Sequence, residues 1–364
     1  MNVKRIHLKV IALLLSISII LNACATGEAA QGEAVQSQAG LSAAQYEQAI
    51  RNVREQNFNV LRGILKMHST FRGTTENAGL KPRFDFDDEN FSVLKAKYGL
   101  PAIAGTGGDL EKSLNILFWL CEHTCHVGDY DNHVPMNALD LLEYAYDTGA
   151  EQGLNCLNLS YILTECLLSL GIPVRWVGLM PFSPYDADNH VVTHVYIAEL
   201  GKWIMLDPTW EAYFKDAEGN ILDVVELRGF LADGREVFLN EEFSYNGTDL
   251  ITNDDEVRWY KQYLAKDLFY FNTSETSGFG RDNSGRGLTV CPAGYSPFVS
   301  RMYGLEYRIE FARTYEGWDE AVRESYIAST TKQIENMRRL FEEDKDAAEE
   351  AYLYISLEDF LAKP

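Results

Sequence analysis

The hydrophobic pattern of the chain is clearest between residues 153 and 210. Residues 156–170 carry apolar side chains almost all round a helical projection, which predicts a buried helix. Gly171 and Pro173 should end it, because glycine favours the turn after a helix and proline cannot continue one. Segments rich in β-branched and apolar residues follow and predict strands at 174–179, 190–198 and 203–206, the last two joined as a hairpin.

Helices are also predicted on both sides of this stretch. Apolar residues recur at helical spacing in segments 42–67, 90–98, 110–125, 136–146, 223–232, 254–271 and 318–341. Residues 237–239 predict a strand, and the Ser-, Gly- and Asn-rich segment 273–286 predicts a surface loop. We therefore expect an α+β fold with five regions: a leader at 1–23, a tether at 24–41, an N-terminal helical region at 42–109, a core at 110–215 and a C-terminal α/β extension at 216–364.

The central stretch contains a cysteine, a histidine and an aspartate in that order. Cys156 opens the buried helix, where the positive end of the helix dipole favours the reactive thiolate. Taken alone, it could also be a small buried apolar residue. His190 and His194 lie four residues apart on a strand, so both point to one side of the sheet and either could accept the thiol proton. Asp207, at the end of the next strand, could orient the imidazole.

These segments resemble the transglutaminase-like superfamily, a set of papain-like thiol enzymes. The resemblance covers about sixty residues and comprises Asn155-Cys156 at a helix start, Leu-Gly-Ile-Pro-Val-Arg at 170–175, His-Val-Val-Thr-His-Val-Tyr at 190–196 and Trp-Ile-Met-Leu-Asp-Pro-Thr at 203–209. It implies a papain-like fold in which the catalytic helix packs on an antiparallel sheet, with a triad of Cys156, His190 and Asp207. His194 stands where the family has a glutamate. It is therefore the alternative or supporting histidine, and His190 is the expected base.

Two further residues are candidates for supporting roles. Gln152 lies four residues before Cys156 and could polarise a carbonyl group, as a glutamine does in papain-like enzymes. The backbone N–H of Cys156 is the alternative donor to the oxyanion. Trp203 opens the fourth segment of the resemblance and could support the triad.

A cluster of cysteines and histidines between residues 121 and 133 raises the alternative of a zinc-dependent enzyme. Cys121 and Cys125 are four residues apart on a predicted helix, however, so both could be core residues of one helix face. We expect no metal ion and no cofactor.

The N-terminus has the pattern of a secretory leader, with Lys4, Arg5 and Lys9 before an apolar run at 10–21. The following Leu-Asn-Ala-Cys24 resembles the bacterial lipobox, in which the cysteine is lipidated; a plain signal peptide cut nearby is the alternative. Lipidation would anchor the protein to the cell membrane or outer membrane, outside the cytoplasm. Residues 25–40 lack aromatic residues and would form a flexible tether.

Charge limits the partners of the chain. The net charge of −22 argues against nucleic acid, because binding to phosphates needs a basic surface. The six cysteines are scattered and do not suggest a disulfide framework.

We therefore expect a cell-surface thiol enzyme that cleaves or exchanges amide bonds of peptides or proteins through a thioester acyl-enzyme, with peptidase or amidase activity favoured over transglutaminase activity. The alternative is a catalytically inactive binding module anchored to the envelope. It is suggested by His194 in place of the family glutamate and by long flanking regions without motifs.

Overall fold

The computed structural model describes residues 43–75, 80, 82–146, 152–281, 285–314 and 317–364. The predicted leader, Cys24 and the tether lie outside the described residues, so they stay predictions. The chain divides into a unit that ends at Arg51 and a unit from Asn52 to Pro364, which contains the features described below. No helix in the described ranges combines the length and apolar character needed to cross a membrane.

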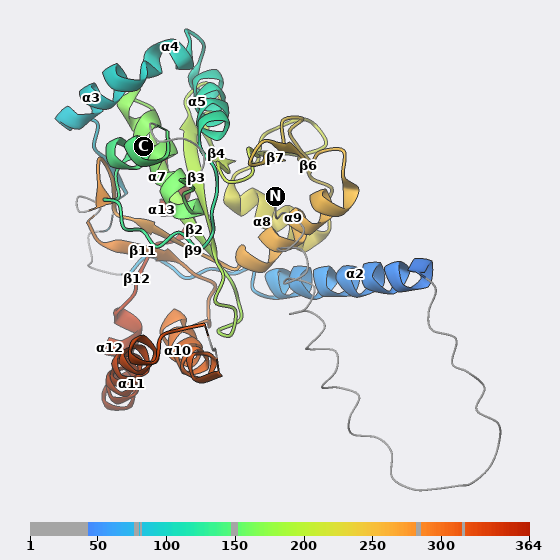
Figure 1. Ribbon diagram of the computed structural model, residues 1–364, viewed down its shortest axis with the longest axis vertical. Coiled ribbons are helices and arrows are strands. Elements are labelled where there is room, and N and C mark those ends of the chain that lie inside the picture. Colours follow the sequence, from blue (N-terminus) through green and yellow to red (C-terminus); the bar gives the residue numbers. More distant parts are fainter. Residues whose placement is uncertain (1–42, 76–79, 81, 147–151, 282–284, 315–316) are drawn as a thin grey trace, which may run out of the picture. The chain divides into compact units, whose positions relative to one another are not determined.

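A six-stranded sheet forms the centre of the second unit (Figure 1). Its order is β12-β11-β9-β2-β3-β4, and its neighbours are antiparallel except for the parallel pair β11–β12. The strands span Val174–Met180 (β2), His190–Ile197 (β3), Lys202–Leu206 (β4), Tyr270–Ser274 (β9), Gly287–Val290 (β11) and Leu353–Tyr354 (β12). Three of the six strands thus come from the predicted C-terminal extension, and the core sheet is built from both regions.

Helix α7, Cys156–Ser169, packs on one face of the sheet. Its side chains are buried on every side from Asn158 onward, as the apolar sequence predicts. Gly171 adopts a left-handed conformation with φ of 80°, which glycine tolerates without strain and which ends the helix. Four helices between α2 and α7 contribute to the same hydrophobic core: Glu89–Tyr98 (α3), Leu100–Ala104 (α4), Asp109–His123 (α5) and Ala138–Ala145 (α6).

The opposite face of the sheet is covered by α8, Val224–Asp233, and α9, Asp254–Asp267 (Figure 1). Strand alternation separates the two cores, because Val195 and Ile197 of β3 face α7 whereas Val192 belongs to the other core. Asp223 and Glu226 cap α8 reciprocally, since Asp223 accepts from the N–H of Glu226 and Glu226 accepts from that of Asp223.

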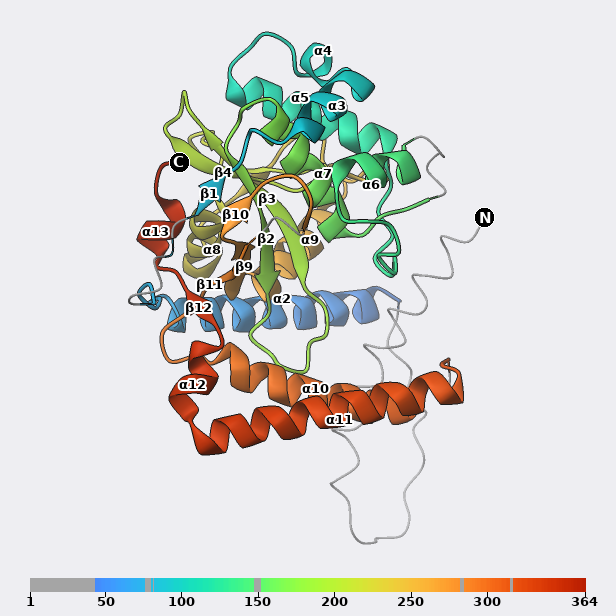
Figure 2. The same cartoon turned by 90° about the vertical axis from the view of Figure 1, so that its left-hand side faces the viewer.

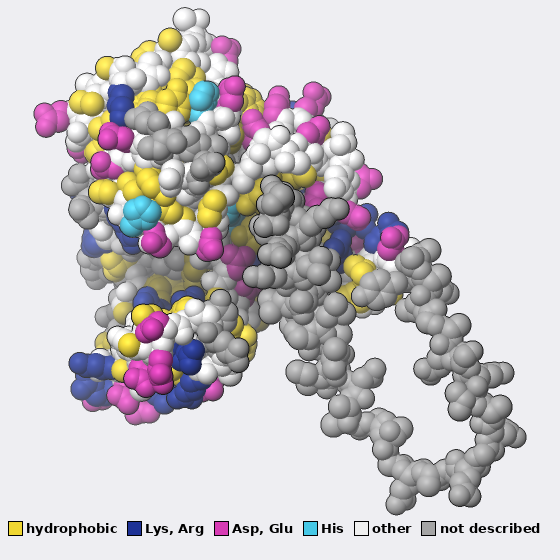
Figure 3. All heavy atoms as spheres, in the orientation of Figure 1, with side chains coloured by type: hydrophobic (Ala, Val, Ile, Leu, Met, Phe, Trp, Pro, Cys, Tyr) yellow, Lys and Arg dark blue, Asp and Glu magenta, His cyan; other side chains and the backbone are white. Residues whose placement is uncertain are grey.

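The remaining elements are peripheral to this sheet. Helix α2, Ala43–Met67, places Leu65 in the second core. Helices α10, Pro297–Thr314, and α11, Glu320–Glu343, pair around a small apolar core of their own (Figure 2). Acidic and basic side chains are intermixed over this hairpin (Figure 3). The short elements are β1 (Arg83–Phe84), β5 (Phe214–Lys215), β6 (Phe238–Leu239), β7 (Ser244–Tyr245), β8 (Thr248–Asp249), β10 (Thr276–Ser277), α12 (Lys345–Glu350) and α13 (Leu357–Leu361).

Two predictions about local structure are wrong. The helix predicted at 254–271 ends at Asp267, and strand β9 begins three residues later in the middle of the sheet. The loop predicted at 273–286 contains β10, and Ser277 and Phe279 are buried. In both cases long-range strand pairing overrides the local pattern: β9 pairs with β2 and β11, and β10 pairs with β1.

Candidate active site

Hydrogen bonds among three asparagine side chains fix the start of α7. Asn155 caps the helix by accepting from the backbone N–H of Asn158, whose side chain in turn accepts from the N–H of Asn155. The side-chain amides of both also donate to Oδ1 of Asn132, at 3.0 and 3.1 Å. These contacts hold Cys156 at the first helical position, as the sequence predicts.

The backbone before Cys156 is pinned to the segment that follows α5. His126 and Leu154 form a parallel bridge, and the N–H of Val127 donates to the carbonyl of Leu154 at 2.8 Å. A Cβ at Gly153 would lie 2.1 Å from a methyl carbon of Val127, so only glycine fits there without movement. This close approach brings His126 to the N-terminal end of α7.

His190 and Asp207 lie at the same end of two antiparallel strands. His190 is the first residue of β3, and Asp207 directly follows the last residue of β4. Nε2 of His190 lies 2.5 Å from Oδ2 of Asp207. Both side chains are buried, with exposures of 2% and 0%. The aspartate is thus placed to orient the imidazole and to stabilise its charged form.

Asp207 has two further hydrogen bonds that fix the carboxylate. The hydroxyl of Tyr260, on α9, donates to Oδ2 at 2.6 Å, and the N–H of Thr209 donates to Oδ1 at 2.9 Å. Tyr260 is fully buried and was not identified from the sequence, where it is one aromatic residue of an amphipathic helix.

The electrostatics favour a charged His190. Burial disfavours the imidazolium, but the charge and hydrogen bond of Asp207, together with a hydrogen bond to Cys156, outweigh it and raise the pKa of His190 well above its ordinary value. Because Nε2 is engaged by Asp207, Nδ1 is the ring nitrogen left for the thiol. Cys156 is a free, half-buried cysteine. We call Cys156, His190 and Asp207 the triad; the arrangement can form a thiolate–imidazolium pair.

His194 lies in a different environment from His190. Its ring stacks on Trp203 and Phe360, with centroids 4.8 and 5.2 Å away, and its Nδ1 is 3.2 Å from Nη2 of Arg175. Burial and the positive charge of Arg175 lower the pKa of His194 well below its usual value. The guanidinium lies over the same two aromatic rings, and Arg175 also donates to the carbonyl of Phe360. In this buried stack, His194 and Trp203 hold the C-terminal segment against the sheet.

His126 is, after Tyr260, a second residue near the triad whose position the sequence did not predict. Burial and the charge of nearby His190 lower the pKa of His126 to about 4, so its ring is neutral at pH 7. Its Nδ1 is 2.9 Å from the hydroxyl of Tyr245. Asn246 clamps its backbone by accepting from the N–H at 2.7 Å and donating to the carbonyl at 3.0 Å. Gln152, which the sequence offered as a residue that could polarise a carbonyl group, has an exposed side chain.

The residues of the predicted zinc cluster have separate partners. Nδ1 of His123 faces the carbonyl of Trp119 at 2.7 Å, and the thiol of Cys121 donates to the carbonyl of Pro208 at 3.2 Å. Nδ1 of His133 faces Asp131. In the part of the chain that the structure describes, no group of three or more His, Cys, Asp or Glu side chains could hold a metal ion. The structure therefore lends the zinc hypothesis no support.

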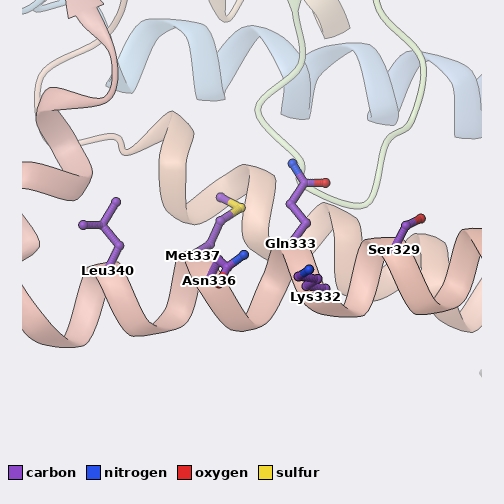
Figure 4. A pocket seen from close by; sticks show the side chains of 6 residues that line it. All are labelled: Ser329, Lys332, Gln333, Asn336, Met337 and Leu340. Carbon is purple, nitrogen blue, oxygen red and sulfur yellow. The ribbon is translucent and has the colours of Figure 1, made fainter.

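The structure contains a small cavity and a larger open groove, which lie in different parts of the fold. A cavity of about 10 Å³ is lined by residues close to the triad in sequence, among them Leu159 and Thr209, and by His126 and Glu211, but by no residue of the triad itself. A larger open groove of about 380 Å³ is lined by Ser329, Lys332, Gln333, Asn336, Met337 and Leu340, all on α11 (Figure 4). It shares no residue with α7, β3 or the segment after β4.

A cysteine-bearing helix packed on an antiparallel sheet, with His and Asp at the end of neighbouring strands, defines a papain-like α+β domain. Residues 98–208 match the model of the Transglutaminase-like superfamily, and a domain of this superfamily occupies that part of the chain. No curated protein matches the chain. A solved structure of a "putative protease" from Parabacteroides distasonis ATCC 8503 is similar at 14% identity and a TM-score of 0.23; the match covers 46% of this chain and 30% of that one.

Proposed function

We propose that the protein is a thiol enzyme that cleaves or exchanges amide bonds of peptides or proteins through the triad. The observation that carries the proposal is the 2.5 Å contact between Nε2 of His190 and Oδ2 of Asp207, with the thiol of Cys156 as a further hydrogen-bond partner of the same ring. A thiolate beside an imidazolium is a strong nucleophile near neutral pH, whereas an isolated thiol is mostly protonated.

The proposed reaction has two halves. The thiolate of Cys156 attacks the carbonyl carbon, the C–N bond breaks, and His190 gives its proton to the leaving amine. A thioester joins the acyl group to Cys156. Water then attacks this thioester while His190 accepts its proton, so the acid leaves and the thiol is regenerated. An amine in place of water would give transamidation; we favour hydrolysis by analogy with bacterial members of the superfamily, which are often taken to be peptidases or amidases.

The oxyanion of each tetrahedral intermediate needs hydrogen-bond donors. The N–H of Cys156 belongs to the first turn of α7, where backbone donors have no intrahelical acceptor. We assign the second donor to the neutral ring of His126. If the Tyr245 hydroxyl donates to Nδ1, then Nε2 carries the ring proton and can donate to the oxyanion.

The direct test is capture of the acyl-enzyme. Purified protein is mixed with a library of capped peptides, quenched in acid and analysed as an intact protein by mass spectrometry. We expect an adduct on Cys156 that hydroxylamine removes, with release of the peptide's amine product. Cys156→Ala should lose the adduct. Cys125→Ala is the matched control, because it removes another partly exposed thiol on the neighbouring segment and should keep it.

An inactive binding module predicts a different outcome. In that case no acyl adduct would form with any peptide, and Cys156 would react with small alkylating agents as an ordinary thiol does. That pair of results would overturn the enzyme proposal.

We further propose that the protein is anchored outside the cytoplasm by lipid at Cys24. This rests on the lipobox-like sequence alone. Cells supplied with an alkyne-bearing fatty acid should label the protein, and Cys24→Ser should abolish the label. Labelling that survives Cys24→Ser would place the lipid elsewhere or refute the anchor.

A further inference from the structure

Aromatic rings form a continuous series beside the triad, from His190 to His126. Successive ring centroids are 5.5 Å (His190–Tyr263), 5.2 Å (Tyr263–Trp259), 5.4 Å (Trp259–Trp210), 4.6 Å (Trp210–Tyr245) and 5.7 Å (Tyr245–His126) apart. These separations are within the range of favourable ring contacts. We call the four rings between the two histidines the aromatic arc: Tyr263, Trp259, Trp210 and Tyr245.

The arc comes from segments beyond the family match, which ends at residue 208. Trp259 and Tyr263 are four residues apart on α9, and their rings stack with an interplanar angle of 8°. Trp210 follows β4, and Tyr245 lies in β7. This side of the site is therefore supplied by the regions that flank the superfamily domain.

The rings of the arc are more exposed than their apolar neighbours. Trp259 is 38% exposed, and the other three rings are half-buried. Tyr260 and Phe243, which pack beside Trp210, are fully buried. An exposed indole ring is not needed to stabilise a core, and ligand sites are typically lined by aromatic side chains with a few polar groups. Here the partly exposed rings begin at Tyr263, whose centroid is 5.5 Å from that of His190.

Charge decides which ligand chemistry fits the arc. The ammonium of Lys266 lies 4.9 Å from the Tyr263 ring and is held there by Asp186 and Asp188 at 3.2 and 3.1 Å. Asp267 also lies 3.4 Å from this ammonium, so its charge is already paired and offers a charged ligand no free partner, while the imidazolium of His190 would repel a cation. An anionic ligand would approach a chain of net charge −22. A neutral, flat, apolar group avoids both penalties.

We propose that the aromatic arc binds an aromatic side chain of the substrate next to the bond that reacts, so that the protein selects peptides by an aromatic residue at that place. The inference rests on the proposed function for the identity of the reacting bond. Stacking and burial against two or more rings should favour an aromatic group over a methyl group by about tenfold or more.

The test compares two alkylating agents of equal chemistry, N-benzyl-2-chloroacetamide and N-methyl-2-chloroacetamide. The rate constant for alkylation of Cys156 is measured with each by mass spectrometry, and their ratio is corrected for the ratio found with free cysteine. We expect a corrected ratio of about ten. Trp259→Ala should bring it close to one by slowing only the benzyl reagent. Phe311→Ala is the matched control, since it removes an aromatic ring that is 50% exposed on α10 and should leave the ratio unchanged.

A second readout does not depend on the reactivity of the thiol. Indole N–H resonances are followed by NMR while N-acetyl-phenylalanine amide or N-acetyl-alanine amide is added. We expect the phenylalanine compound to shift the signals of Trp210 and Trp259 and the alanine compound to leave them in place.

The outcomes separate the two proposals. A reactive Cys156 with a corrected ratio of one in the wild-type protein overturns the arc as a subsite and leaves the thiol enzyme standing. A Cys156 that reacts like an ordinary thiol with both reagents refutes the proposed function. The indole titration then decides the arc, and equal responses to the two amides refute it.

Discussion

Replacing Asp207 with asparagine should trap His190 in the wrong tautomer. The N–H of Thr209 donates to Oδ1 at 2.9 Å, so in the variant the amide oxygen must occupy this position. The amide NH₂ then lies where Oδ2 was, 2.5 Å from Nε2 of His190, and donates to that nitrogen. The hydroxyl of Tyr260, now facing the NH₂ group, can rotate to become an acceptor.

The wrong tautomer should slow the reactions of the Cys156 thiol. With Nε2 as acceptor, the ring proton of neutral His190 moves to Nδ1 and faces Cys156, so the ring can no longer take the thiol proton. In serine triads the same replacement lowers turnover by about ten-thousandfold, equivalent to about 5 kcal/mol in the barrier. We expect a loss of similar order in acyl-enzyme formation and a large loss of iodoacetamide labelling at neutral pH.

The assay combines the labelling rate of Cys156 with ¹⁵N NMR of the His190 ring, which distinguishes the two tautomers. Wild-type protein should carry the proton on Nε2 when neutral, and Asp207→Asn should carry it on Nδ1. Unchanged folding is checked by near-UV circular dichroism. An asparagine variant that keeps the Nε2–H tautomer and labels within about tenfold of the wild-type rate would refute this reasoning.

Three further predictions concern the buried groups around the triad. Tyr260→Phe keeps the ring packing but removes the hydrogen bond to Asp207, so the free energy of unfolding in urea should fall by about 1.5–3 kcal/mol; an unchanged value would contradict this. Burial raises the pKa of Asp267 to about 8, so the folded state retains a proton that the unfolded chain loses near pH 4. Stability should therefore fall between about pH 4 and 8, by at most about 1.4 kcal/mol per pH unit, and Asp267→Asn should flatten this part of the urea profile. His194→Ala should lower stability by about 2–5 kcal/mol through loss of its stacking contacts while the thiol stays reactive, whereas His190→Ala should abolish that reactivity; the opposite ranking would mean that the wrong histidine was chosen.

Local patterns were sufficient to predict α7 and the strands that follow it. The apolar run ends at Gly171 and Pro173, and both residues act through their own backbone rather than through distant contacts. Cys156 and Asp207 stand at the start and end of such locally specified elements, whereas His190 was chosen over His194 through the resemblance to the transglutaminase-like superfamily. The capping residues of α8 were predictable for the same reason.

Long-range pairing explains what the sequence did not reveal. Strand β9 follows a strongly helical pattern and becomes a strand only by pairing with β2, which lies about ninety residues earlier. Tyr260 reaches Asp207 from a helix 53 residues away in sequence. The sequence placed His126 in a candidate zinc cluster, because its neighbours in sequence are Cys and His. Its hydrogen-bond partners in the structure, Tyr245 and Asn246, come from a hairpin about 120 residues away in sequence.

The pH dependence of iodoacetamide labelling at Cys156 tests the central claim most directly. The rate is measured from pH 4 to 10, with the labelled residue identified by mass spectrometry, in wild-type protein and in His190→Ala. The thiolate–imidazolium pair predicts a labelling midpoint well below the free-thiol value of about 8.5, and a return to that value or above in the variant. A wild-type midpoint at or above 8.5, unchanged by loss of His190, would contradict the pair and with it the proposed chemistry.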